Sequence, residues 1–173
     1  MNAPARVLVT AKAQVMLRNL LQTHGGLMFH QSGGCCDGSS PMCYPLGEYL
    51  IGDRDVLLGI LDLRVDAGVP SPDLPTGADG VPVWISGSQF GAWKHTQLII
   101  DLVPGRGSGF SLEGPEGFRF LSRGRVFSDD EVVALQSAPP VLGAAYAEGT
   151  LPPLPAEPTV VAVADEACPV PAR

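Results

Sequence analysis

Glycine and proline divide this chain into short pieces, and this punctuation limits the folds open to it. The 173 residues include 21 Gly and 17 Pro, which interrupt long helices and are typical of folds built from short strands and tight turns. Hydrophobic residues make up 45% of the chain and charged residues 17%, which is enough apolar material for a packed core. We therefore expect a folded domain rather than a disordered chain.

The N-terminal part of the chain predicts a helix over residues 11–23. Thr10 can cap this helix, its apolar residues recur at three-and-four spacing, and Gly25 or Gly26 can end it. Two shorter helices are expected, one after a cap at Ser86 or Ser88 and the other, to about residue 136, after the capping box that begins at Ser128.

Runs of apolar or alternating residues predict about six strands. They cover residues 27–31, 55–62, 81–85, 97–103, 110–113 and 118–123. The last two are expected to form a hairpin through a turn at 114–117, and Pro82 confines its strand to a sheet edge or a strand start. These elements predict an α+β fold that is rich in mixed or antiparallel sheet, with an N-terminal helix and short helices.

The domain is expected to end near residue 138. Residues 65–80 are rich in Gly and Pro and predict a mobile insertion between two strands. Residues 139–173 predict a Pro-rich, acidic and largely disordered tail, in which residues 160–164 could add one edge strand. Cys168 lies in this tail and is expected to be a free surface thiol.

The charge of the chain limits its partners. Eleven Lys and Arg against 18 Asp and Glu give a net charge of −7, which argues against nucleic acid and against anionic membranes. The sequence has no apolar run long enough to cross a bilayer, and its N-terminal residues do not resemble a signal peptide. We therefore expect a cytoplasmic protein whose cysteines are thiols, metal ligands or redox groups rather than structural disulfides.

The segment of residues 30–43, HQSGGCCDGSSPMC, carries most of the chemical information. Cys35, Cys36 and Cys43 lie within nine residues, and thiolates bind zinc, iron and cuprous copper well. The surrounding glycines allow tight turns and backbone N–H groups that favour the thiolate. Adjacent cysteines rarely bind one ion together, so we expect two thiolates plus His30, His95 or a group from a second subunit.

Three other interpretations of these thiols remain open. Cys35 and Cys36, or one of them with Cys43, could exchange disulfides. Cys35 or Cys36 could act as a nucleophile with His95 as its base. The three thiols could also be inert and buried in a tight loop.

The sequence of residues 30–45, together with residues 89–113 and 118–123, resembles an uncharacterised bacterial family. Genes of that family often lie beside those of acetaldehyde and other aldehyde dehydrogenases. The resemblance covers most of residues 7–127 and implies an association with aldehyde or alcohol metabolism. An aldehyde or alcohol dehydrogenase is therefore an expected partner.

A fainter resemblance is to the A-type iron–sulfur carriers. The amphipathic helix after Thr10, the Gly-Gly-Cys at residues 33–35 and the segments at 80–83 and 107–111 follow the order found in that family. Cys35 matches its first ligand. The C-terminal Cys-Gly-Cys of the carriers is absent, so Cys36, Cys43 and a histidine would have to replace it.

These observations together predict a metal-binding accessory protein. Zinc or iron is the expected metal, with copper as a further candidate, and the candidate ligands are Cys35, Cys36, Cys43, His30 and His95. A homodimer is expected because one loop supplies few ligands. The alternatives are a small thiol-dependent redox or aldehyde-handling enzyme and a non-catalytic subunit that docks through its edge strand or acidic tail.

Overall fold

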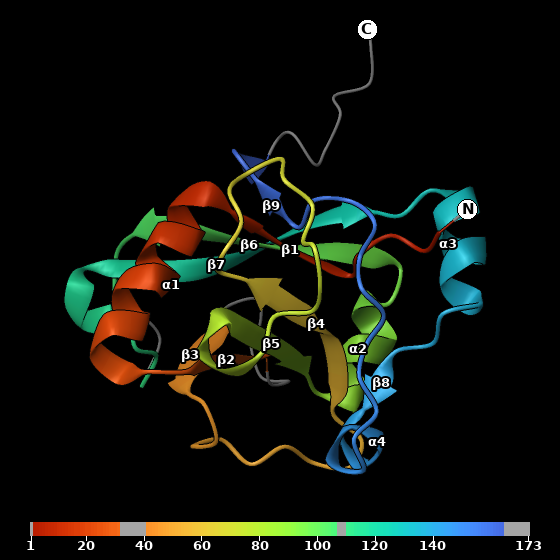
Figure 1. Ribbon diagram of the computed structural model, residues 1–173, viewed down its shortest axis with the longest axis horizontal. Helices are drawn as coiled ribbons and strands as arrows, with labels where there is room; N and C mark the ends of the chain where they lie inside the picture. Colours follow the sequence, from red (N-terminus) through yellow and green to blue (C-terminus); the bar gives the residue numbers. More distant parts are fainter. Residues whose placement is uncertain (1, 32–40, 107–109, 165–173) are drawn as a thin grey trace, which may run out of the picture.

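Two β-sheets share one apolar core and form the body of the protein (Figure 1). The computed structural model describes residues 2–31, 41–106 and 110–164. The strands are β1 (Val7–Thr10), β2 (Leu27–Gln31), β3 (Met42–Pro45), β4 (Val56–Asp62), β5 (Gly80–Ile85), β6 (Thr96–Pro104), β7 (Phe118–Val126), β8 (Val141–Leu142) and β9 (Val160–Val161).

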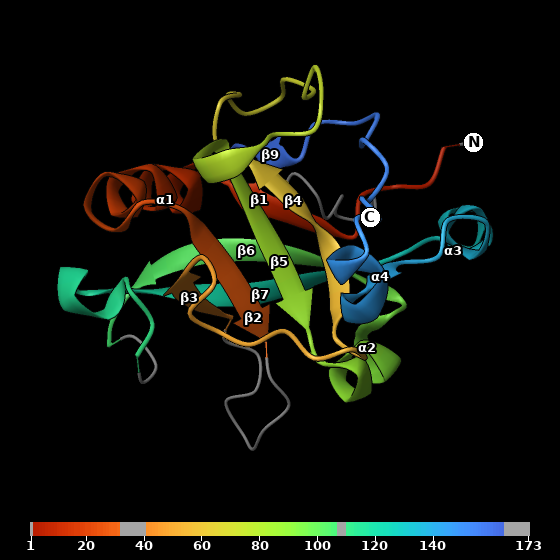
Figure 2. The ribbon, with the colours of Figure 1, turned by 60° about the horizontal axis from the view of Figure 1, so that its bottom comes forward.

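Both sheets are mixed. The four-stranded sheet has the order β7-β6-β1-β9, in which β1 is parallel to both neighbours and β6 is antiparallel to β7. The five-stranded sheet has the order β3-β2-β5-β4-β8, in which only β2 and β5 are parallel. Figure 2 shows β2, β4 and β5 crossing β6 and β7 at a steep angle. The predicted α+β class with mixed sheets is confirmed.

The described residues form the α-helices α1 (Ala11–His24), α2 (Gly87–Trp93), α3 (Asp129–Gln136) and α4 (Gly143–Ala147). The first three begin at caps that the sequence predicts, whereas α4 was not predicted and has no side-chain cap. The Thr10 hydroxyl accepts the Ala13 N–H, and Gly25, at φ 73°, ends α1. Ser86 caps α2, and Ser128 forms a capping box with Glu131 in α3. None of the helices among the described residues has the length and apolar character needed to span a bilayer.

The main core lies between the two sheets and under α1. The apolar face of α1 contributes buried residues such as Leu17, β1 and β6 contribute Val9 and Ile100, and β2 and β5 contribute Phe29 and Val83. Side chains along a strand alternate between its two faces, so the intervening residues of β2 lie on the outer face of the five-stranded sheet. A second apolar cluster covers that outer face, and its buried members are Met28, Leu57, Trp84 and Val141.

One prediction about strands is wrong. Residues 110–113 are not a strand: β7 pairs with β6 instead, and the Glu113 side chain turns back to accept the Phe120 N–H. For Pro82 the sequence allows a sheet edge or a strand start, and the structure has the second, since β5 lies between β2 and β4. Its Pro82 is accommodated near the strand start, and the ladder between β5 and β2 begins only at Val83.

The C-terminal part of the described chain contacts both sheets. Residues 139–164, which the sequence assigns to a largely disordered tail, contain β8, α4 and β9. β8 pairs with β4 and β9 pairs with β1, and each covers a strand that would otherwise be a sheet edge. Val141 in β8 and Val160 in β9 are buried there. β9 is the edge strand that the sequence predicts. Cys168 lies outside the described residues.

The loop between β4 and β5 contains the predicted insertion. Arg64 bonds both oxygens of Asp62 and also the carboxylate of Asp73, and the Gly68 N–H bonds the Val160 carbonyl. These contacts attach the loop to β4 and to β9. The mobility expected for residues 65–80 stays a prediction.

Candidate functional site

A histidine–carboxylate pair lies on the outer face of the five-stranded sheet. His30 is in β2 and is 3% exposed. Its Nε2 lies 3.0 Å from Oδ2 of Asp55, which directly precedes β4, and the Gly52 N–H donates to the same oxygen at 2.9 Å. The pair therefore joins a central strand to a loop that is distant in sequence.

The Tyr49 ring packs against the imidazole ring of His30. The ring centroids of His30 and Tyr49 are 4.2 Å apart, and Tyr49 in turn lies 5.0 Å from Tyr44. The Tyr44 hydroxyl donates to the sulfur of Met42 at 3.3 Å, and burial, followed by the proximity of Tyr49, raises the pKa of Tyr44. These contacts limit rotation of the imidazole ring.

The Asp55 contact determines what His30 can do chemically. When Nε2–H donates to the carboxylate, the ring carries its lone pair on Nδ1, and imidazoles in this tautomer bind metal ions or accept protons at that atom. Carboxylate–imidazole pairs of this kind orient histidine ligands of zinc and also histidine bases of thiol and serine nucleophiles. The arrangement supports both roles.

Cys43 lies on the opposite face of the same sheet from His30. In the β2–β3 ladder Cys43 pairs with Phe29, whereas His30 pairs with Met42. Because facing residues of paired strands point to the same side, Cys43 points into the core between the sheets, where it is fully buried. The structure therefore does not bring Cys43 and His30 together, although the sequence groups them as ligands.

The surroundings of Cys43 disfavour the thiolate that metal binding requires. Burial raises the pKa of the thiol well above its ordinary value, and the nearby Glu113 raises it further. The backbone N–H of Cys43 donates to the Ser111 hydroxyl at 2.9 Å, and that hydroxyl donates to the Glu113 carboxylate. Cys43 is thus a small apolar core residue in this fold.

Cys43 is expected to resist alkylation in the folded protein. Iodoacetamide reacts with thiolates, so mass spectrometry of peptides from protein treated at neutral pH should find Cys43 unmodified. Treatment in denaturant should modify it fully and serves as the control. Rapid modification of Cys43 without denaturant would contradict its burial.

Glu113 is expected to make stability depend on pH. Burial raises its pKa above 4.5, and the hydrogen bonds from Ser111 and from the Phe120 N–H only partly oppose this. A raised folded-state pKa gives stability that is present below the unfolded pKa and is lost as the pH rises through the folded one. The free energy of unfolding of Glu113→Gln should therefore fall less than that of the native protein between pH 4.5 and neutrality. Urea titrations across this range measure the difference, and parallel curves would contradict it.

His95 is exposed and follows α2. Its backbone carbonyl accepts the Phe127 N–H at 3.0 Å, which anchors the chain between α2 and β6. Within residues 2–31, 41–106 and 110–164, no hydrogen bond or ring contact joins His95 to His30. The two imidazoles that the sequence offers as alternatives thus occupy different environments, and among the described residues a carboxylate is hydrogen-bonded to the ring of His30 but not to that of His95.

Cys35 and Cys36 lie outside the described residues, so their predicted roles are not tested by the structure. Of the described residues on either side of them, His30 in β2 pairs with Met42 in β3. In the part of the chain that the structure describes, no group of three or more His, Cys, Asp or Glu residues could hold a metal ion.

Asp55 and Tyr49 are functional candidates that sequence reasoning missed. The sequence places Asp55 only at the start of a strand, and no spacing motif connects it to His30. Asp55 comes near His30 because β2 and β4 both flank β5 in the sheet. This order of strands is not visible in the sequence.

Fold and site together define an α+β protein with a part-buried carboxylate–imidazole pair on the outer face of one sheet. The model of the family described as a domain of unknown function, DUF779, matches residues 16–126. This match covers more than half of the chain, so the protein belongs to the DUF779 family. No curated protein and no solved structure was found to match it.

Proposed function

We propose that this protein binds a thiophilic metal ion, zinc or iron with copper as a further candidate, at the His30 end of β2. The proposed ligands are Nδ1 of His30 and the thiolate of Cys35 or Cys36, with Asp55 as the group that orients the imidazole. Cys43 and His95 are not among the proposed ligands, because Cys43 is buried in the core and His95 is exposed beyond α2. A second subunit would supply the remaining ligands in a homodimer.

The observation that carries this proposal is the contact between Nε2 of His30 and Oδ2 of Asp55. Metal-bound histidines almost always donate their other ring N–H to a carboxylate, a carbonyl or water. A buried imidazole of this kind, five residues before two adjacent cysteines, fits a mixed nitrogen and sulfur site. The Tyr49 ring supports the proposal because it restricts the orientation of the ligand.

The biological role is part of the proposal. We place the protein in the cytoplasm as an accessory to an aldehyde or alcohol dehydrogenase, to which it would deliver the metal or whose metal it would protect. The support is the resemblance of residues 30–45 to the family encoded beside aldehyde dehydrogenases. The resemblance of residues 33–35 to the first ligand segment of A-type iron–sulfur carriers supports iron as the cargo.

Metal analysis of protein purified without a histidine tag tests the proposal. We expect bound zinc or iron, with loss of metal in His30→Gln and in the double variant Cys35→Ser, Cys36→Ser. His24→Gln is the matched control, because His24 is an exposed histidine at the end of α1. The proposal fails if the protein has no affinity for zinc, iron or copper, or if His24→Gln and His30→Gln lose metal equally.

The same histidine–carboxylate pair favours a second candidate function, a thiol nucleophile with His30 as its base. The thiolate of Cys35 or Cys36 would add to the carbonyl carbon of an aldehyde, the oxygen would take up the proton that left the thiol, and a hemithioacetal would form. Metal-free protein that forms aldehyde adducts at these cysteines, at a rate that Asp55→Asn lowers, would support this function. Adduct formation that is unchanged in Cys35→Ser and Cys36→Ser would exclude it.

A further inference from the structure

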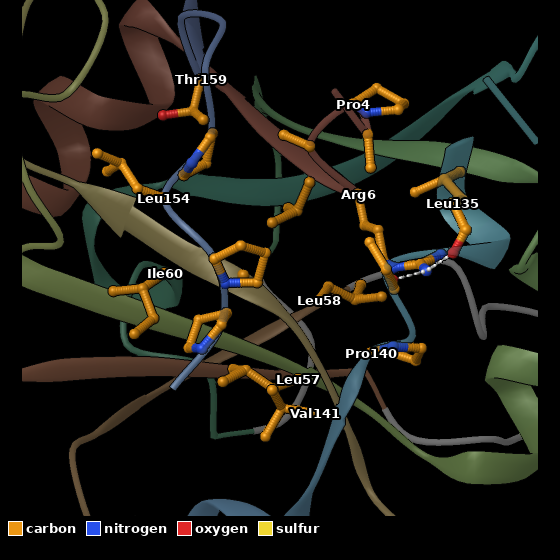
Figure 3. A pocket seen from close by; sticks show the side chains of 18 of the residues that line it. Pro4, Arg6, Leu57, Leu58, Ile60, Leu135, Pro140, Val141, Leu154 and Thr159 are labelled. Carbon is orange, nitrogen blue, oxygen red and sulfur yellow. Dashed lines mark hydrogen bonds between the residues drawn. The ribbon is translucent and has the colours of Figure 1, made fainter. Parts of the chain in front are cut away.

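A pocket of about 290 Å³ lies where the N-terminal residues, β4 and the C-terminal segment meet (Figure 3). One wall is formed by residues 3–7, a second by β4, and a third by the connection from α3 to β8. The Pro-rich residues 152–156, which precede β9, cover the remaining side. The volume is at the lower end of the range for small-molecule sites.

The lining of this pocket is mostly apolar, and its polar side chains are those of Asn2, Arg6 and Thr159. Leu57, Leu58, Ile60 and Val141 contribute aliphatic surface, and several prolines add more. Arg6 is the only charged residue among the described residues that line it. A mostly apolar pocket with a single cation favours a ligand that combines a hydrocarbon part with one negative charge.

Arg6 is held in place, but no carboxylate is paired with it. Its Nη2 donates to the carbonyls of Ala138 at 2.9 Å and of Leu135 at 3.4 Å, and its guanidinium lies 5.6 Å from the centre of the Phe90 ring. Within the described parts of the chain no Asp or Glu forms an ion pair with it. Burial lowers the pKa of this arginine, which is the expected effect when a cation loses water without gaining an anion.

We propose that this pocket binds a small aliphatic carboxylate, with the carboxylate on Arg6 and the hydrocarbon chain against Leu58 and its aliphatic neighbours. Two donor positions of the guanidinium, Nε and Nη1, form no hydrogen bond with the described residues, and a carboxylate accepts such donors strongly. A phosphate group fits less well, because its second charge would find no other cation in the lining.

The site is independent of the metal-binding proposal. It shares no residue with the pair of His30 and Asp55 or with the cysteine segment. Loss of metal in a variant of those residues should therefore leave carboxylate binding unchanged, and the failure of either proposal is distinguishable from the failure of the other.

Calorimetric titration with hexanoate and with hexan-1-ol tests the proposal. The two compounds have the same chain length and differ in charge, so the difference between them reports the contribution of Arg6. We expect one hexanoate per chain, bound at least about tenfold more tightly than the alcohol, since hydrogen bonds to charged groups are the strong ones. Equal affinity, or no binding of hexanoate at millimolar concentration, would overturn the proposal.

Two pairs of variants locate the site. Arg6→Met keeps an apolar chain at this position, removes the charge and should lower hexanoate affinity at least about tenfold. Its control is Arg106→Met, at an exposed arginine that does not line the pocket. Leu154→Trp should fill the pocket and weaken binding while Arg6 is retained. Its control is Leu151→Trp, at an exposed position that does not line the pocket.

The second pair keeps the test decisive if Arg6→Met does not fold, because Arg6 also anchors the connection between α3 and β8. Binding that is weakened by Leu154→Trp and not by Leu151→Trp supports the site. Hexanoate affinity that is unchanged in both Arg6→Met and Leu154→Trp would place binding elsewhere and overturn it.

Discussion

Asp55→Asn is expected to lower the affinity for zinc roughly 10- to 100-fold while the fold is retained. The Asp55 carboxylate accepts from Nε2–H of His30 at 3.0 Å and from the Gly52 N–H at 2.9 Å. An amide can donate as well as accept, so asparagine no longer fixes the imidazole tautomer that presents the Nδ1 lone pair. The loss of the negative charge also makes the imidazole a weaker ligand.

Competition with a chromophoric zinc chelator measures this effect. Asp53→Asn is the matched control, because Asp53 lies in the same loop, is exposed, and makes the same change of charge. Circular dichroism should show the same fold for both variants. Equal zinc affinities of Asp53→Asn and Asp55→Asn would show that the carboxylate next to His30 has no special role in binding.

The second large effect expected is on stability, in Gly143→Ala. A Cβ atom at residue 143 would lie 2.0 Å from the carbonyl oxygen of Gly52 and 3.1 Å from the Ile51 side chain. A backbone oxygen cannot move aside as a flexible side chain can, so β8 and α4 must separate from the 51–55 loop. We expect the free energy of unfolding to fall by roughly 2–4 kcal/mol.

Urea unfolding of Gly143→Ala and Gly91→Ala measures this effect against a matched control. Gly91 lies within α2, and no atom lies within 4 Å of a Cβ added there. Alanine is favoured over glycine inside a helix, so Gly91→Ala should be neutral or stabilise by less than about 1 kcal/mol. A Gly143→Ala protein as stable as the native one would contradict the close approach of residues 52 and 143.

The local elements of this fold are well predicted from the sequence because their signals are local. Thr10 and Gly25 lie at the two ends of α1, and the capping box at Ser128 begins α3, as the side-chain chemistry of caps requires. The strands β2 and β6 are rich in apolar residues and are buried along almost their whole length. In each case the residues that determine the element lie within it or directly beside it in the sequence.

The pairing of elements is not visible in the same way. Residues 110–113 alternate like a strand, yet β6 is the partner of β7, and Glu113 is used as an acceptor within the core. The C-terminal residues lack strong periodicity, but Val160 completes the sheet beside β1. Such elements are stabilised by tertiary contacts that a short window of sequence does not contain.

The candidate site was predicted only in part for a related reason. His30 and Cys43 are close in sequence and occupy adjacent strands, but the β2–β3 register pairs Cys43 with Phe29 and not with His30. A register shift of one residue would exchange the faces of Cys43 and Met42, and the sequence alone does not fix that register. Asp55 was not predicted because its contact with His30 depends on the order of the strands.

The family match and the folding unit have different boundaries. The match covers residues 16–126. It leaves out β1, which lies between β6 and β9 in the four-stranded sheet, and it also leaves out β8 and α4. The Gly143 and Ala144 N–H groups bond the carbonyls of Asp55 and Asp53, and Val141 and Tyr146 pack on the outer cluster around Trp84. A fragment trimmed to the matched residues would lack the central strand of one sheet and expose the indole of Trp84 to water. Shortened versions of this protein should therefore aggregate or stay unfolded. If such a fragment bound no metal, the cause would be the loss of the fold and not the chemistry of the proposed ligands.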